Sequence, residues 1–204
     1  MSKSKDAKPL SGSSVFNVPN QLTSIRLILS AVMFAMIGLE YYLVAMVIFI
    51  VAALTDWLDG YWARKYGQIT VLGRILDPFA DKVIISGSLV FLVVAPGMMS
   101  TPWGLRAWMV VVIIAREMLV TMLRGIIEKQ GGDFSARWSG KWKMVLQCVA
   151  VGASLFFLSR TAPAEPTADW AWWVMIVSIW SAMVLTIYSG LIYIVAAIRI
   201  LRSK

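Results

Sequence analysis

The sequence predicts an all-α polytopic membrane protein with six transmembrane helices and both termini in the cytoplasm. Its 204 residues are 59% hydrophobic and only 15% charged, with a mean hydropathy of +0.76, which is too apolar for a soluble domain. Six apolar runs approach the ~20 residues that a helix needs to cross a bilayer. Lysine and arginine gather in alternate connections between these runs, which is typical of loops on the cytoplasmic side.

The predicted spans follow one another with short connections. They comprise residues 22–39, 41–63, 78–95, 105–128, 141–159 and 170–198. The last run is the clearest, because it has no charged residue between Asp169 and Arg199. Residues 1–16 are polar and lack the apolar core of a secretory signal, so we expect a cytoplasmic tail there. Residues 17–204 would then form one six-helix membrane domain.

Basic residues set the predicted orientation. With an even number of spans, the tail lysines, the 64–74 loop, the 129–143 loop and the C-terminus fall on one side. The opposite side has only Arg106 and Arg160. Because cytoplasmic loops carry the excess of Lys and Arg, we expect the first group in the cytoplasm. Five tryptophans near predicted boundaries are expected to be interfacial anchors: Trp103, Trp108, Trp170, Trp172 and Trp173.

Four aspartates flank the loop between the second and third spans. Residues three or four apart share a helix face, so Asp56 pairs with Asp59, and Asp77 pairs with Asp81. Crowded carboxylates at a membrane repel one another unless cations are bound, and two divalent ions would balance four negative charges. The chain has no histidine and only Cys148 as a cysteine, so oxygen ligands point to two Mg²⁺ or Mn²⁺ ions.

Other residues of this stretch suit a phosphate ligand. Gly60 and Gly73 would let a bulky ligand approach the backbone, and Arg64 can bind a phosphate through its guanidinium. Asp77, followed by Pro78, could alternatively cap the third helix, which is compatible with metal binding.

The motif DxxDGxxAR at 56–64, then after eight residues GxxxDxxxD at 73–81, resembles the signature of the CDP-alcohol phosphotransferases. The resemblance implies a six-helix membrane enzyme, usually a homodimer, that transfers a phosphatidyl or related group from a CDP-linked donor to an alcohol and releases CMP. It implies that Asp81 is the catalytic base. The metal ligands that it implies are Asp56, Asp59, Asp77 and Asp81. The residues that it implies at the cytidine diphosphate are Gly60, Arg64, Thr70 and Gly73.

The signature alone does not choose the acceptor alcohol. Arg116 and Arg124 lie two turns apart on one face of the fourth span, and Lys141 and Lys143 begin the fifth. Together they could form a basic pocket for a second anion. Alternatively, the two lysines are anchors at the cytoplasmic surface, and Arg116 simply pairs with neighbouring Glu117.

Three further segments are similar to phosphatidylglycerophosphate synthases: NVPNQLTSIR at 17–26, AREMLVTMLR at 115–124 and SGKWK at 139–143. This resemblance implies CDP-diacylglycerol as donor and sn-glycerol 3-phosphate as acceptor. The residues that would hold the acceptor phosphate are Arg116, Arg124, Lys141 and Lys143. Asn20, Thr23 and Arg26 share a face and could touch the donor, with capping by Asn20 and interfacial anchoring by Arg26 as alternatives.

Three alternative functions differ in chemistry. A cardiolipin synthase of the same family would use phosphatidylglycerol, which is also an anion, as acceptor. A cation transporter would use the aspartates for transported ions, but such sites tend to lie near the midplane, and arginine would oppose cations. A non-catalytic interaction protein would use the ten tryptophans and twelve methionines for helix packing. Small residues permit close helix contact and are given no catalytic role, namely Gly87, Ser88, Gly152, Ala153, Ser189 and Gly190. We expect a bacterial plasma-membrane enzyme whose site faces the cytoplasm, with no nucleic-acid partner.

Overall fold

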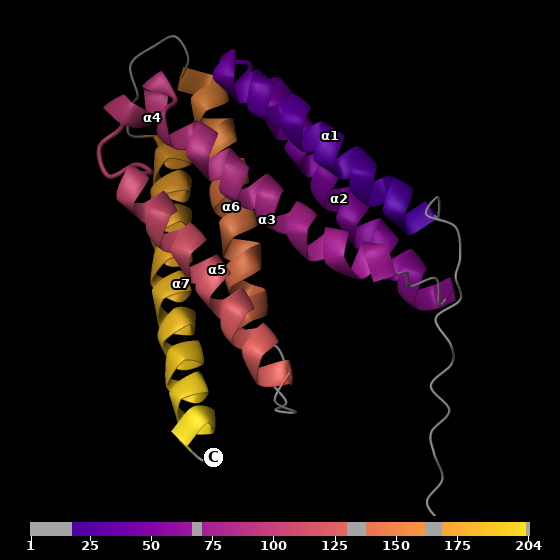
Figure 1. Ribbon diagram of the computed structural model, residues 1–204. Coiled ribbons are helices and arrows are strands. Elements are labelled where there is room, and N and C mark those ends of the chain that lie inside the picture. Colours follow the sequence, from indigo (N-terminus) through magenta and orange to yellow (C-terminus); the bar gives the residue numbers. More distant parts are fainter. Residues whose placement is uncertain (1–17, 67–70, 130–137, 162–168, 203–204) are drawn as a thin grey trace, which may run out of the picture.

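A computed structural model describes residues 18–66, 71–129, 138–161 and 169–202. Within these ranges, the side chains of residues 18–20, 56–66, 71–75, 77, 128–129, 138–141 and 199–202 are not described. The helices are α1 (Val18–Gly38), α2 (Tyr42–Tyr66), α3 (Val71–Val93), α4 (Pro96–Ser100), α5 (Ala107–Lys129), α6 (Trp138–Thr161) and α7 (Trp170–Arg202) (Figure 1). Every regular element in the described ranges is therefore a helix, as predicted.

Six long helices correspond to the six predicted spans, and the third differs most. It begins at Val71, seven residues before the predicted span at 78. Gly73, Arg74 and Asp77 interrupt the apolar sequence there, but they are helical. Pro78 consequently lies inside α3, where it has no N–H to donate to the preceding turn. The alternative of a helix cap at Asp77 is therefore wrong.

Three described segments are long and apolar enough to cross a membrane: Gln21–Gly38, Trp142–Thr161 and Trp170–Ile198. A shorter apolar stretch, Tyr42–Thr55, forms the first part of α2. Charged residues interrupt the apolar sequence of α3 and α5. Crossing of the membrane by all six long helices stays a prediction, as does the position of both termini, and the predicted tail lies outside the described residues.

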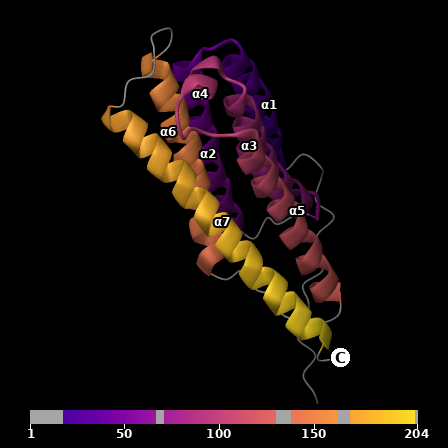
Figure 2. The ribbon, with the colours of Figure 1, turned by 90° about the vertical axis from the view of Figure 1, so that its left-hand side faces the viewer.

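The helices pack in two groups that share α3 and α6. Helix α1 packs against α2 and α3, whereas α7 packs against α5 and α6. Helix α3 contacts α5 and α6, and α6 also contacts α2, so these contacts join the groups. Figure 1 shows α4 at the end opposite the C-terminus, and Figure 2 shows α7 running the length of one face. Large apolar side chains remain exposed on the outside, as on Ile28, Val111 and Val184, which suits a lipid environment.

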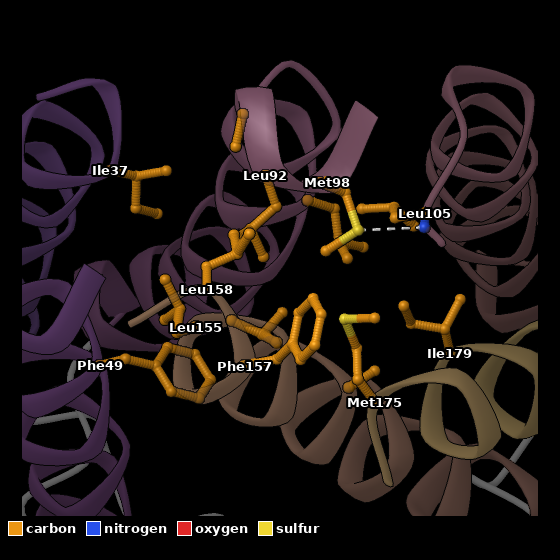
Figure 3. Close-up of a cluster of buried hydrophobic side chains, with 14 of the residues drawn as sticks. Ile37, Phe49, Leu92, Met98, Leu105, Leu155, Phe157, Leu158, Met175 and Ile179 are labelled. Atoms are coloured by element: carbon orange, nitrogen blue, oxygen red, sulfur yellow. Dashed lines mark hydrogen bonds between the residues drawn. The ribbon is translucent and has the colours of Figure 1, made fainter. Parts of the chain in front are cut away.

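The larger of two apolar clusters among the described residues lies toward the end of the molecule that contains α4 (Figure 3). It joins side chains of all seven helices, including Ile37, Phe49, Leu92, Met98, Phe157 and Met175. The backbone N–H of Leu105 donates to the sulfur of Met98 at 3.3 Å. Of the predicted tryptophan anchors, Trp103, Trp108, Trp170 and Trp173 are exposed and Trp172 is half-buried. The buried charged side chains of Arg26 and Lys143 come before the buried core residues of their helices, which start at Met33 in α1 and at Ala150 in α6.

Candidate functional site

The backbone places the four motif aspartates in two pairs. Asp56 and Asp59 lie one turn apart in α2, and Asp77 and Asp81 lie one turn apart in α3. The link between these helices has four residues, which keeps the helix ends within about 18 Å of each other. Both helices pack against α1.

Most side chains of the predicted metal and nucleotide sites lie outside those that the structure describes. These residues are Asp56, Asp59, Gly60, Arg64, Thr70, Gly73 and Asp77. Among the described residues, no group of three or more His, Cys, Asp or Glu side chains could hold a metal ion. The predicted ligand set has four carboxylates on two linked helix ends, which fits hard divalent cations. Because most of these side chains are not described, the metal site stays a prediction.

Asp81, the fourth aspartate, is described and contacts α1. Its Oδ1 accepts a hydrogen bond from Nη1 of Arg26 at 3.3 Å. The Arg26 side chain is 1% exposed and the Asp81 side chain 30%. The cation of this pair is therefore buried, and its carboxylate is partly exposed. Thr23, one turn before Arg26, is also buried. Arg26 therefore does not act as an exposed interfacial anchor, and it lies beside the predicted base.

Lys82, the next residue, contacts a different helix. Its Nζ donates to Oγ1 of Thr121 on α5 at 2.7 Å, and this hydroxyl donates to the carbonyl of Glu117 at 2.8 Å. Consecutive residues of a helix do not face the same way, so Asp81 reaches α1 while Lys82 reaches α5. The predicted base thus lies next to a contact with the helix that carries Arg116. Sequence reasoning gave Lys82 no role, although a lysine inside an apolar helix is itself a functional signal.

A buried charged cluster joins α5, α6 and α7. Oε1 of Glu117 accepts hydrogen bonds from Nη1 of Arg116, at 3.0 Å, and from Nζ of Lys143. Side-chain exposure is only 9% for Arg116, 19% for Glu117 and 6% for Lys143. Lys143 is therefore no surface anchor, and the alternative in which Arg116 pairs with neighbouring Glu117 is confirmed.

Helix α7 completes the surroundings of Arg116. Nη2 of Arg116 donates to Oγ of Ser189 at 2.9 Å, and the guanidinium lies 5.5 Å from the centre of the Tyr193 ring. A Cβ added at Gly190 would lie 3.1 Å from Cγ of Arg116, so the absent side chain makes room for the arginine. Ser189 and Gly190 were expected only to pack helices. Nothing in the sequence links them to Arg116, which lies 73 residues before Ser189.

The cluster brings together only part of the predicted acceptor site. Arg124 makes no hydrogen bond or ion pair with the described side chains, and its Nε is buried without a partner. The side chain of Lys141 lies outside those described. Within the described part of the chain, Nε of Arg116 is likewise buried without a hydrogen-bond partner. Buried N–H donors normally have a hydrogen-bond acceptor. The Nε–H groups of Arg116 and Arg124 are therefore available to an anionic ligand.

The profile of a known family matches most of the chain. The match to CDP-alcohol phosphatidyltransferase covers residues 16–188, which include every predicted site residue. The chain belongs to the CDP-alcohol phosphatidyltransferase family. The family resemblance based on the two motifs is thereby confirmed.

Three similar bacterial proteins share one name. The "CDP-diacylglycerol–glycerol-3-phosphate 3-phosphatidyltransferase" of Bacillus subtilis is 35% identical, over 79% of this chain and 89% of the relative. The protein of that name from Haemophilus influenzae is 33% identical, over 89% of this chain and 94% of the relative. The one from Salmonella choleraesuis is 32% identical, over 89% of this chain and 95% of the relative. This member of the family is thus similar to them over almost their full length.

Proposed function

We propose that this family member transfers the phosphatidyl group of CDP-diacylglycerol to sn-glycerol 3-phosphate, giving phosphatidylglycerophosphate and CMP. The observation that carries the proposal is the buried cluster of Arg116, Glu117 and Lys143 beside α3, the helix of Asp81. Two cations in an apolar helix layer suit an acceptor that has its own phosphate. The names of the bacterial relatives support the same acceptor.

Asp81 is the proposed general base. The hydroxyl oxygen of the acceptor attacks the phosphatidyl phosphorus, the bond from this phosphorus to the oxygen of CMP breaks, and the hydroxyl proton passes to the Asp81 carboxylate. Arg26 orients this carboxylate through the contact with Oδ1. No covalent enzyme intermediate is needed, because donor and acceptor react in one displacement.

The donor site would use the two motif segments. Two Mg²⁺ or Mn²⁺ ions, when bound, would offset the negative charge of the diphosphate. The residues that would hold them are Asp56, Asp59, Asp77 and Asp81. The residues that would contact the cytidine diphosphate are Gly60, Arg64, Thr70 and Gly73.

The acceptor site would use the cationic cluster. Arg116 and Lys143 would bind the phosphate of glycerol 3-phosphate, together with Arg124 and Lys141. The contact of Lys82 with Thr121 keeps α3 and α5 together, so the acceptor hydroxyl can lie near Asp81 while its phosphate lies near α5.

We further propose six membrane crossings, cytoplasmic termini and a homodimer in a bacterial plasma membrane. The polar residues of α3 and α5 are then part of the site, and they do not argue against crossing. The donor's acyl chains would stay in the bilayer while its nucleotide reaches the cytoplasmic ends of α2 and α3.

An acceptor screen tests the proposed function. Purified protein in detergent is given radiolabelled CDP-diacylglycerol with glycerol 3-phosphate, phosphatidylglycerol or glycerol in separate reactions. We expect CMP and phosphatidylglycerophosphate with glycerol 3-phosphate alone. EDTA should abolish turnover, and added Mg²⁺ or Mn²⁺ should restore it.

Other outcomes identify the alternatives. Cardiolipin formed from phosphatidylglycerol would identify a cardiolipin synthase. Absence of CMP with every acceptor, together with cation uptake into proteoliposomes, would identify a transporter. Full turnover in excess EDTA would contradict the two-ion site.

A further inference from the structure

We propose that Glu117 is a positioning residue of the acceptor site, an inference that rests on the proposed function. Its carboxylate would hold Arg116 and Lys143 in place for the acceptor's phosphate without touching the reacting atoms. The geometry that carries the proposal is the single oxygen, Oε1, that accepts hydrogen bonds from both cations.

Glu117 fixes two cations that come from different helices. Arg116 belongs to α5, and Lys143 belongs to α6, so the contact of Lys143 with Glu117 is a hydrogen bond and ion pair between these two helices. Without a shared carboxylate, two buried cations would repel each other and separate. Glu117 therefore keeps them close enough to bind one phosphate.

The cluster leaves donors for a ligand. A guanidinium has five N–H donors and an ammonium has three. Arg116 uses one nitrogen for Glu117 and another for Ser189, and its Nε is buried without a hydrogen-bond partner among the described residues. Of the side chains that the structure describes, Lys143 donates to Glu117 alone. Both cations thus keep unused N–H groups while Glu117 and Ser189 fix their direction.

The charges of the cluster also fit this role. Glu117 cancels one of the two positive charges, so the pair can stay buried before the acceptor arrives and still attract an anion. The backbone of Glu117 is tied to α3 as well, since Thr121 donates to its carbonyl and accepts from Lys82. These two hydrogen bonds therefore fix the position of Glu117 relative to α3, the helix of Asp81.

Glu117→Gln tests the role, because the amide keeps the shape and removes the charge. We expect the KM for glycerol 3-phosphate to rise about tenfold, as expected for loss of a hydrogen bond between charged groups. The kcat at saturating acceptor and the KM for CDP-diacylglycerol should stay within about twofold of the unchanged protein. Glu117→Asp keeps the charge and should recover part of the acceptor KM.

Glu40→Gln is the matched control. Glu40 is exposed in the turn between α1 and α2, so the same exchange there should leave both KM values unchanged. An unchanged KM for glycerol 3-phosphate in Glu117→Gln would overturn the proposal. An equal rise of both KM values with a lowered melting temperature would also overturn it, since that pattern indicates general loss of structure.

The unchanged protein in the same assay tests the proposed function separately. If it accepts only another alcohol, the proposed function is wrong, and the Glu117 comparison is made with that alcohol under the same criteria. If it releases no CMP with any acceptor, both proposals are wrong.

Discussion

Asp81 and Lys82 are consecutive residues that connect α3 to two other helices. Asp81 contacts Arg26 of α1, and Lys82 contacts Thr121 of α5. The first contact orients a carboxylate, and the second brings α5 next to it. A substitution at either residue can therefore change both the catalytic activity and the packing of the helices. The choice of substitution has to separate these two effects.

Asp81→Asn separates them. The amide oxygen can still accept the hydrogen bond from Arg26, but it cannot take a proton from the acceptor hydroxyl. We expect turnover to fall by at least 10²-fold, the lower end of what general-base catalysis contributes. Binding of CDP-diacylglycerol, measured by titration in detergent, should remain detectable.

The matched control is Asp169→Asn. Asp169 pairs with Arg160 at 3.3 Å before α7, away from the motif residues, so its exchange should leave turnover within about twofold. Full activity of Asp81→Asn would show that another group takes the proton.

At the scale of residues, the sequence predicts contacts between side chains that are close together along the chain. The aspartate motif and the pairing of Arg116 with Glu117 follow from spacing or adjacency along the chain. Ser189, Gly190 and Tyr193 could not be predicted as partners of Arg116, because only the packing of α7 on α5 brings them together. The side chains of the metal site are outside the described residues and stay a prediction.

At the scale of elements, apolar runs locate the long helices but not their ends. Helix α3 begins seven positions before the predicted span, in a segment where Gly73, Arg74 and Asp77 interrupt the apolar residues, since backbone hydrogen bonds do not depend on hydropathy. The short helix α4 was not predicted. It begins with Pro96, which is favourable in a first turn, but five residues are too few to show a periodic pattern.

The close packing of α1 on α3 requires a residue without a side chain at Gly87. A Cβ added there would clash with Cζ of Phe34, whose ring stacks on Phe91 with centroids 5.2 Å apart. Gly87→Ala should therefore lower the free energy of unfolding by about 1–3 kcal/mol, the usual cost of overpacking. Thermal unfolding in detergent measures the change.

Gly152→Ala is the control for that substitution. A Cβ at Gly152 would meet nothing within 4 Å, so alanine should be neutral or stabilise α6 by up to about 1 kcal/mol through its helix propensity. Equal destabilisation by both substitutions would contradict close packing at Gly87.

At the scale of the whole molecule, the proposed orientation rests on the charge pattern of the sequence. Along the chain, basic residues concentrate in the predicted tail, two predicted cytoplasmic loops and the C-terminus, and the net charge is +8. In the structure, α4 and the exposed Trp103 lie at the end of the helix assembly opposite the last turns of α7. In the proposed orientation, α4 therefore lies outside the cell.

Single-cysteine variants test that orientation. Cys148→Ser removes the chain's only cysteine, and then Pro102→Cys, in the exposed connection after α4, or Lys204→Cys is added. In intact cells, a membrane-impermeant maleimide should label the first thiol, and it should reach the second only after permeabilisation. Labelling in the reverse order would show that the protein is inverted.

Arg116 is held from several directions at once. Glu117 and Ser189 take two of its nitrogens, the Tyr193 ring lies against its guanidinium, and Gly190 leaves space for its stem. A lysine would carry the same charge but would lack the flat, forked head that fits these neighbours. Shape, as much as charge, therefore makes this position unsuited to lysine.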